Sequence, residues 1–451
     1  MMKSWLERIA GYFQPFLFVT VMATGISSNI LQSFPYEARW LRDCSYPMFA
    51  LACLLFIYLQ LLQALHMYLF IRKKSFTEYF DQYFRDMTHN VFWGTYLMGL
   101  ITIVNYIVVL ANNEVKNPKV GRRMMMLAYV LWWYDVILCL CCTWGISFII
   151  WRKFNSSIDG SDYRTPNEKM SKEGLKCALV LLIVPMFVAA SCSGKFVMTD
   201  LFTSLFSRDI QLMVLVLTAL IWLHAVIFLF IVITIIFWGF YINKIPPMRQ
   251  VFTLFLLLGP MGQASFGILL LTEDVRTYVI KHYPRSTSMN DYDILLLTIP
   301  WCFKIIGLLL ALALLAMGYF ITVIGFMAVA SKYNETAEIK ENGQVRVKRI
   351  YHFHKGWLAM TFPMGTMSLG STYVWRDYNQ YVPMLTFRVL GAIYGVICIV
   401  WTMVCIAGLC YNSIIPEVKI LCGLITHSDQ KSETSSLSFK DDRSLHNQNQ
   451  A

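Results

Sequence analysis

Residues 250–271 read QVFTLFLLLGPMGQASFGILLL, a stretch of 22 residues without a charged side chain and with Gly259-Pro260-Met261-Gly262 at its centre. An apolar run of this length is sufficient to cross the hydrocarbon core of a bilayer as a helix. Proline and glycine interrupt that helix at mid-depth, and the freed backbone groups need protein or water around them. The stretch therefore predicts a membrane protein in which this helix lines a permeation pathway.

The composition of the whole chain also indicates a membrane protein. Of its 451 residues, 57% are hydrophobic and 14% are charged, and the mean hydropathy is +0.53, so a water-soluble core could not bury all the apolar surface. The formal net charge of +11 comes from basic residues scattered among short connections, which argues against a nucleic-acid partner. The twelve cysteines lie mostly within apolar runs, and we expect neither a disulfide scaffold, nor a metal site, nor a cofactor.

Ten apolar runs of about twenty residues or more follow one another along the chain. They cover residues 12–32, 45–71, 91–111, 123–151, 175–195, 209–241, 250–271, 294–330, 353–374 and 384–412. We expect the first run to be a retained helix, because it lacks a convincing signal-peptide cleavage site. The prediction is an all-α polytopic membrane protein with one transmembrane domain over residues 1–427 and a disordered polar tail over residues 428–451.

The distribution of Lys and Arg among the connections predicts the orientation of these spans. If the N-terminus is cytosolic, the connections on the inner side carry 22 basic residues and those on the outer side carry 12. Basic loops resist translocation, so both termini are expected on the cytosolic side of the membrane.

Odd-numbered and even-numbered spans differ in their prolines. Pro185, Pro260 and Pro363 lie at the centres of odd spans, whereas Pro47 and Pro300 fall within the first two turns of even spans, where proline is tolerated. Odd spans also carry glycines near their middles, which suits close backbone approach around a narrow space. The alternative is that these residues serve helix packing alone, and glycines in the eighth span blur the contrast.

If the odd spans do surround a passage, all of them run outward from the cytosol. Their N-terminal ends, with the positive ends of the helix dipoles, would then face the cytosol together and attract anions. Kinks at proline are expected to set the width of the passage and not to bind the anion, because they free carbonyl oxygens.

Charged residues inside apolar spans are costly and are candidates for function. Asp135 and Lys304 lie in the fourth and eighth spans at similar depths, so they could pair within one chain or across subunits, and a structural role is favoured for both. His224 in the sixth span is interpreted as a packed and hydrogen-bonded residue in preference to a proton relay.

Several long segments, in order along the membrane region, carry a resemblance to a known family. They are PFLFVTVMATGISSNIL (15–31), FWGTYLMGL (92–100), YVLWWYD (129–135), INKIPPMRQVFTLFLLLGPMGQASFGILLLT (242–272), PWCFKII (300–306) and KGWLAMTFPMG (355–365). On these segments the chain resembles the tellurite-resistance/dicarboxylate transporter family, which includes malate permeases and plant slow anion channels.

The resemblance implies ten transmembrane helices arranged as five helical hairpins around a quasi-fivefold central pore, with the odd helices inside, in a homotrimer whose subunits each conduct. It implies a small anion as substrate, with sulfite the closest match, and a location in the lipid of the plasma membrane. The expected pore-lining residues are Gly25, Gly94, Gly99, Pro185, Gly259, Pro260, Gly262, Phe266, Pro363 and Gly365.

The family resemblance also implies a phenylalanine gate in the ninth helix, at the local pattern Trp357-Leu-Ala-Met-Thr-Phe362-Pro363. Phe362 is therefore the expected pore gate, with Phe266 as the alternative. On the residues alone, a phenylalanine before a mid-helix proline is a packing residue.

The chain is expected to transport sulfite out of the cytosol without acting as an enzyme. A negative cytosolic potential favours anion exit by about 2.3 kcal/mol per charge per 100 mV. The sequence has no Walker A motif for nucleotide binding and no cluster of catalytic side chains near one membrane face. The open alternative is a proton-coupled carrier of sulfite or of dicarboxylates such as malate.

Overall fold

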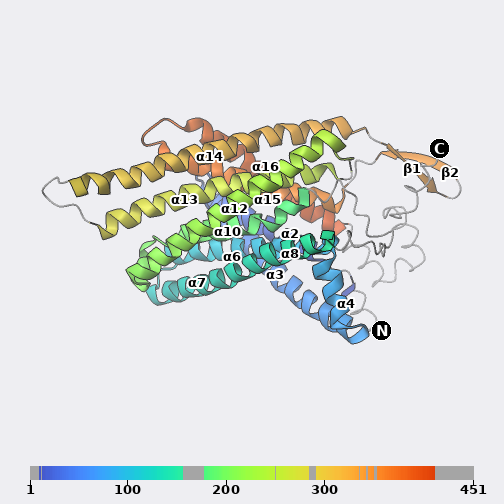
Figure 1. Cartoon of the computed structure of the whole chain (residues 1–451), viewed down its shortest axis with the longest axis horizontal. Coiled ribbons are helices and arrows are strands. Elements are labelled where there is room, and N and C mark those ends of the chain that lie inside the picture. Colours follow the sequence, from blue (N-terminus) through green and yellow to red (C-terminus); the bar gives the residue numbers. More distant parts are fainter. Residues whose placement is uncertain are drawn as a thin grey trace.

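Long helices lie side by side along the long axis of the molecule (Figure 1). The structure is a computed structural model that describes residues 10–11, 13–155, 177–248, 250–283, 291–334, 336–341, 344–349 and 353–411. The proposed polar tail over residues 428–451 lies outside these described residues.

Five helices form an inner layer in which each helix contacts the next. They are α2 (Val19–Gln32), α6 (Trp93–Asn113), α10 (Val184–Phe196), α13 (Leu258–His282) and α15 (Thr361–Tyr378). Contacts run from α2 to α6, from α6 to α10, from α10 to α13 and from α13 to α15, and α15 contacts α2 again. The five helices, which we call the inner ring, therefore close on themselves.

Five longer helices cover the inner ring from outside. They are α3 (Arg39–Lys73), α7 (Pro118–Leu140), α12 (Arg208–Asn243), α14 (Asp291–Lys332) and α16 (Leu385–Leu409). Each outer helix packs against the inner helix that precedes it in the chain, and also contacts the next inner helix around the ring. The chain thus alternates between the inner and the outer layer.

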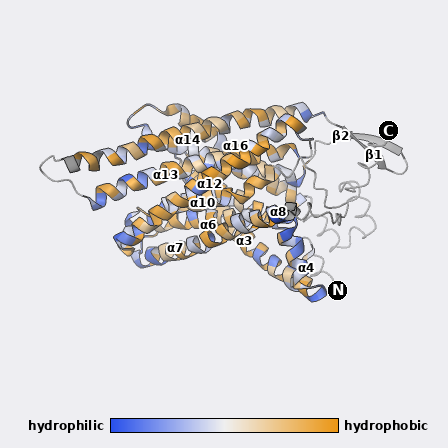
Figure 2. Cartoon of the chain, viewed as in Figure 1, coloured by the Kyte–Doolittle hydropathy of each residue, from blue (hydrophilic) through white to orange (hydrophobic). Residues whose placement is uncertain are grey.

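The two layers differ sharply in burial. Within the most apolar window of Val251–His282 every residue is buried, whereas 22% are buried in the corresponding window of Arg39–Lys73. Hydrophobic residues dominate the lengths of the helices and hydrophilic residues collect at their ends (Figure 2). The apolar side chains exposed on the outer helices are therefore suited to lipid and not to water.

Eight helices in the described part of the chain are long and apolar enough to cross a membrane. They match eight of the ten predicted spans, and the chain is a multi-pass membrane protein. The other two predictions, 175–195 and 353–374, correspond to the inner helices α10 and α15 with the short segments before them. Helix α10 is short, and α15 carries polar residues, but both are buried within the bundle.

Four of the five inner helices begin with a 3-10 segment, which explains the mid-span prolines. These segments are η1 (Pro15–Phe18), η5 (Leu179–Leu182), η6 (Val251–Leu257) and η7 (Lys355–Met360). Pro185, Pro260 and Pro363 occupy the second or third residue of the α-helix that follows. Proline has no N–H and is tolerated only in the first turn of an α-helix, so each of these prolines fixes the point at which the α-helix starts.

The prolines of the outer helices do not lie where the sequence predicted. Helices α3 and α14 start at Arg39 and Asp291, so Pro47 and Pro300 lie inside the helices, beyond the first two turns. The prediction was wrong because polar turns extend these helices beyond the apolar runs. The 42 residues of α14 would span about 63 Å, roughly twice the thickness of a hydrocarbon core.

The remaining elements are short and lie in the connections. They are the helices α4 (Phe76–Phe80), η2 (Asp81–Arg85), α5 (Met87–Asn90), η3 (Cys141–Gly145), α8 (Ile146–Asn155) and α11 (Asp200–Leu205), and the strands β1 (Thr336–Glu341) and β2 (Gln344–Arg349). The two strands pair antiparallel with Thr336 opposite Arg349. This hairpin was not predicted, although apolar and polar residues alternate on both sides of the sequence Asn342-Gly343, a common hairpin signal. Figure 1 places the hairpin and α4 at the same end of the bundle.

Candidate functional site

The start of α13 faces the interior of the inner ring. A Cβ atom placed on Gly259 would lie 3.9 Å from Val184 Cγ2 and 3.9 Å from Pro363 Cγ. These two side chains belong to α10 and α15, the helices on either side of α13 in the ring. The side of α13 that is close to both α10 and α15 is the side that faces the interior of the ring. Gly259, Val184 and Pro363 therefore mark a level at which the interior of the ring is narrow.

Phe362 lies on the interior face of α15. Gly365 of the same helix faces Ile26 of α2, and Gly370 faces the Gly262 carbonyl oxygen of α13. At 100° per residue, Phe362 lies roughly 60° from the direction of Gly365 and roughly 80° from that of Gly370, between the two ring neighbours of α15. Its side chain is 2% exposed. The expected gate residue therefore points into the ring at about the level of Gly259.

A second aromatic level lies farther along the ring. Phe266 follows Gly259 by seven residues, which is about two turns, so the two residues share the interior face of α13 at levels about 10 Å apart. The ring of Phe266 meets that of Tyr373 from α15 edge-on, with 4.7 Å between the centroids. Tyr373 shares its helix face with Phe362, because eleven residues make about three turns.

The other expected pore-lining glycines lie at contacts between helices. A Cβ atom on Gly25 would overlap Thr102, one on Gly94 would overlap the Leu181 carbonyl oxygen and approach Pro185, and one on Gly99 would lie 3.2 Å from Val21 Cγ1. These contacts join α2, α6 and the start of α10. Close packing within the ring therefore accounts for these glycines and for Pro185.

Gly262 and Gly365 also lie at close contacts between inner helices, on the other side of the ring. Gly262 abuts the backbone of Thr366 in α15, and a Cβ atom on Gly365 would lie 2.6 Å from Ile26 Cδ1 of α2. Pro260 is fully packed in the first turn of α13.

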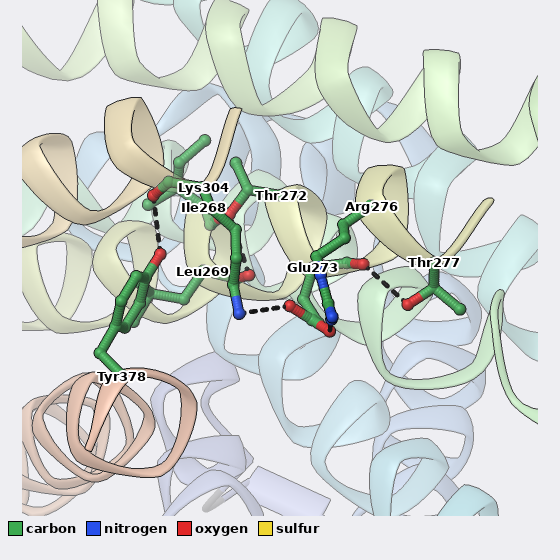
Figure 3. Close-up of polar contacts among 8 residues, drawn as sticks. All are labelled: Ile268, Leu269, Thr272, Glu273, Arg276, Thr277, Lys304 and Tyr378. Atoms are coloured by element: carbon green, nitrogen blue, oxygen red, sulfur yellow. Dashed lines mark hydrogen bonds and ion pairs between the residues drawn. The ribbon is translucent and has the colours of Figure 1, made fainter. Parts of the chain in front are cut away.

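Lys304 pairs with a carboxylate that the sequence analysis did not single out. Its ammonium nitrogen lies 2.7 Å from Glu273 Oε2 of α13, and Arg276 Nη1 lies 2.6 Å from Glu273 Oε1. The Tyr378 hydroxyl donates to the Lys304 carbonyl oxygen at 2.7 Å (Figure 3). The Lys304 side chain is 3% exposed and that of Glu273 is 33% exposed, so the pair ties the outer helix α14 to the inner ring.

Asp135 does not pair with Lys304 within one chain. Its Oδ2 atom accepts a hydrogen bond from the Cys139 thiol at 3.3 Å, one turn along α7, and its carboxyl group is fully buried. Among the described residues its Oδ1 atom has no hydrogen-bond partner. Helix α7 packs against α6 and α10, whereas α14 packs against α13 and α15, so the two charges lie on different sides of the ring.

His224 lies on the exposed surface of α12, as a hydrogen-bonded residue. Its Nε2 atom accepts from the Trp144 indole at 3.1 Å. Its place on an outer helix gives it no contact with the interior of the ring. Among the described residues, no group of three or more His, Cys, Asp or Glu side chains could hold a metal ion.

An apolar groove of about 510 Å³ runs between the outer helices α12 and α14. Its lining includes Trp222, Phe230, Trp238 and Leu314, with Met261 of α13 at its floor. Apolar side chains offer no hydrogen bonds to an anion, so this outer groove does not suit a charged substrate.

Removing Glu273 from the Lys304–Glu273 pair should destabilise the protein more than removing Lys304. Glu273→Gln removes the carboxylate that contacts the buried Lys304 ammonium and should cost about 3 kcal/mol. Lys304→Met should cost about 1 kcal/mol, because Glu273 is partly exposed and keeps Arg276. Thermal unfolding of the two variants in detergent measures this order, and a lower midpoint for Lys304→Met than for Glu273→Gln would contradict it.

Comparisons with known proteins point in one direction. Residues 12–410 match the family described as Voltage-dependent anion channel. The chain is 54% identical to the Sulfite efflux pump SSU1 of Saccharomyces cerevisiae over 407 residues, which cover 90% of this chain and 88% of the yeast protein. It is 29% identical to the Sulfite efflux pump SSU1 of Candida albicans over 403 residues, which cover 89% and 74% of the two chains. It is 25% identical to that of Trichophyton rubrum over 401 residues, which cover 87% and 88%.

Proposed function

Because the chain belongs to the voltage-dependent anion channel family, we propose that it carries sulfite out of the cytosol through the interior of its inner ring. Membership in this family places it among membrane transport proteins and not among enzymes. The observation that carries the proposal is the closed inner ring, whose interior is faced by Gly259, Phe266, Phe362 and Pro363. The similarity to the fungal sulfite efflux pumps supplies the substrate.

The proposed architecture is five helical hairpins, each made of one inner and one outer helix, around a quasi-fivefold pore of ten membrane-spanning helices. The alternation of layers and the ring of contacts support it. The passage narrows where Gly259, Val184 and Pro363 meet, and Phe362 is its gate. Phe266 and Tyr373 line the next level. A hydrophobic constriction of this kind gates by excluding water from the passage.

The proposed driving force is the membrane potential. A negative cytosol favours exit of an anion by about 2.3 kcal/mol per charge per 100 mV, so a selective pore exports sulfite without ATP. The inner helices start at the cytosolic side, where the positive ends of their dipoles attract anions to the entrance.

We further propose a homotrimer in the plasma membrane with both termini in the cytosol. The excess of Lys and Arg in the connections on one side supports this orientation. A tag at the C-terminus should be labelled only after cells are permeabilised, and labelling of intact cells would reverse the orientation. The mass of the detergent-solubilised protein, measured by light scattering, tests the trimer, and a monomeric mass would reject it.

Reconstitution into liposomes tests the transport function. Vesicles loaded with sulfite and held at an inside-negative potassium diffusion potential should release it at a rate that increases with voltage, and a pH gradient alone should not drive release. Protein-free vesicles under the same voltage give the background. Release that depends strictly on a proton gradient would replace the pore with a proton-coupled carrier, and release of malate in preference to sulfite would change the substrate.

A further inference from the structure

Two cations project toward the interior of the inner ring at its C-terminal end. Lys195 comes from the last turn of α10, and Arg376 comes from the last turn of α15. The Lys195 ammonium lies 5.5 Å from the centroid of the Phe266 ring, and the Arg376 guanidinium lies 5.2 Å from that of Tyr373. Since Phe266 and Tyr373 contact each other, the two cations flank one aromatic pair.

The helical position of Lys195 independently places it on the interior face. It follows Val184 by eleven residues, about three turns, so both share one face of α10 about 16 Å apart along the axis. Val184 is the residue that faces Gly259 inside the ring. Other sides of α10 are occupied, with Pro185 toward Gly94 of α6 and Gly194 toward Leu270 of α13.

Arg376 also lies at the C-terminal end of the inner ring, on α15, which packs on the opposite side of α13 from α10. It follows Phe362 by fourteen residues, about four turns, so it continues the interior face of α15. Its Nη2 atom lies 3.5 Å from the Ser33 carbonyl oxygen, at the end of α2. The guanidinium therefore lies between two inner helices and is open to solvent.

Among the described residues, neither cation forms an ion pair with a carboxylate at contact distance. The carboxylates at this end of the ring are Glu273 and Asp274 of α13 and Asp377 of α15, but Glu273 is engaged by Lys304 and Arg276. The Asp274 carboxylate lies on the side of α13 that faces Gly194 of α10. Asp377 adjoins Arg376 in sequence but points roughly 100° around the helix from it, so it interacts with both Lys304 and Arg376 through the electrostatic field without an ion-pair contact to Arg376. In the described part of the chain the Lys195 ammonium donates no hydrogen bond, and Arg376 keeps for a ligand the N–H groups that are not directed at the Ser33 carbonyl oxygen.

We propose that Lys195 and Arg376 bind a small divalent oxyanion at the C-terminal end of the inner ring and favour doubly charged over singly charged anions in transport. The proposal rests on the function proposed above and names the class of anion within it. An ammonium offers three donors and a guanidinium offers a planar fork, which together match an oxyanion with three oxygens. Two cations attract a dianion about twice as strongly as a monoanion at the same position.

The test compares sulfite with nitrate in proteoliposomes, at one ionic strength and at a pH near neutral, where about half of the sulfite is already a dianion. The double variant K195Q/R376Q should lower the ratio of sulfite to nitrate flux by about tenfold or more, with a smaller decrease in each single variant. The charge-conserving variants K195R and R376K should keep the ratio within about threefold. Arg388→Gln is the matched control, because Arg388 also stacks on aromatic rings, those of Tyr36 and Trp375, but belongs to the outer helix α16.

An unchanged ratio in a folded double variant, or an equal loss of both fluxes, would overturn the proposed preference for dianions. If wild-type vesicles release no sulfite at all, the proposed function itself fails, which separates the two failures. Wild-type protein gives a second measurement that needs no variant. Sulfate, as an unreactive divalent oxyanion, should slow the acylation of Lys195 by an amine reagent, measured by mass spectrometry, more than chloride at equal ionic strength. Equal protection by both ions would reject the site.

Discussion

Phe362→Ala should increase sulfite flux in proteoliposomes roughly tenfold, which corresponds to a barrier lower by about 1.4 kcal/mol. The phenyl ring lies on the interior face of α15, and the level beside it is narrowed by Gly259, Val184 and Pro363. Replacing the ring by a methyl group widens the hydrophobic constriction, so water and a hydrated anion can occupy it more often. The measurement is sulfite release at a fixed inside-negative voltage, normalised to the amount of folded protein.

Two variants separate gating from general loosening of the bundle. Phe196→Ala removes a phenylalanine that is equally buried in α10 but packs against Trp132 and Phe202. It should lower the unfolding midpoint without increasing flux. Phe266→Ala tests the alternative gate at the second aromatic level. If Phe266→Ala increases sulfite flux and Phe362→Ala does not, the gate is Phe266 of α13. If Phe196→Ala increases sulfite flux as much as Phe362→Ala does, Phe362 is not a gate.

The separation into inner and outer helices could be predicted from sequence, because it reflects local backbone requirements. Mid-span prolines fix the start of an α-helix after a 3-10 segment, and glycines allow close approach. Both features are properties of single helices and are visible in the chain without knowledge of its partners. The structure confirms that the odd-numbered spans are the buried ones. The facing direction of Phe362, in contrast, depends on where α2 and α13 lie around α15.

The partner of Lys304 could not be predicted, because sequence gives the depth of a residue in a span but not the order of helices around the ring. Asp135 and Lys304 lie at similar distances from the ends of their spans, yet α7 and α14 contact different pairs of inner helices. The true partner, Glu273, fell in a predicted connection. An apolar scan ends at the first charged residue, whereas α13 continues to His282.

The same limit hid Lys195 and Arg376 from the sequence analysis. Both lie at the ends of inner helices, in stretches that the scan assigned to connections or to the last residue of a span. A usable signal was present, since Lys195 continues the helical spacing of Val184, but it indicates an interior face only once the face of Val184 is known. The structure supplies that face through the contact with Gly259.

Gly262→Ala should destabilise the folded protein by about 3 kcal/mol, the upper part of the usual range for an added methyl group in a packed core. A Cβ atom there would overlap the backbone of Thr366 and lie 2.7 Å from its carbonyl oxygen. A backbone cannot turn aside as a flexible side chain does, so α13 and α15 would have to move apart and open the inner ring. We expect a large loss of folded protein in membranes, measured by size-exclusion chromatography of a fluorescent fusion, and a lower unfolding midpoint for what remains.

Gly259→Ala, one turn earlier on the same helix, should have the opposite profile. Its Cβ atom would have ordinary contact distances of 3.9 Å to Val184 and Pro363, so the fold has room for it, and alanine favours helix by up to about 1 kcal/mol relative to glycine. The methyl group would, however, project into the ring interior between Val184 and Pro363, so sulfite flux should decrease, and more so in Gly259→Val. For Gly262→Ala, an unfolding midpoint equal to that of the wild type would show that the backbones of α13 and α15 are not in direct contact at this position. Full flux in both Gly259 variants would mean that anions do not pass this level, because a passage already lined here by the Val184 and Pro363 side chains cannot accept added volume without narrowing.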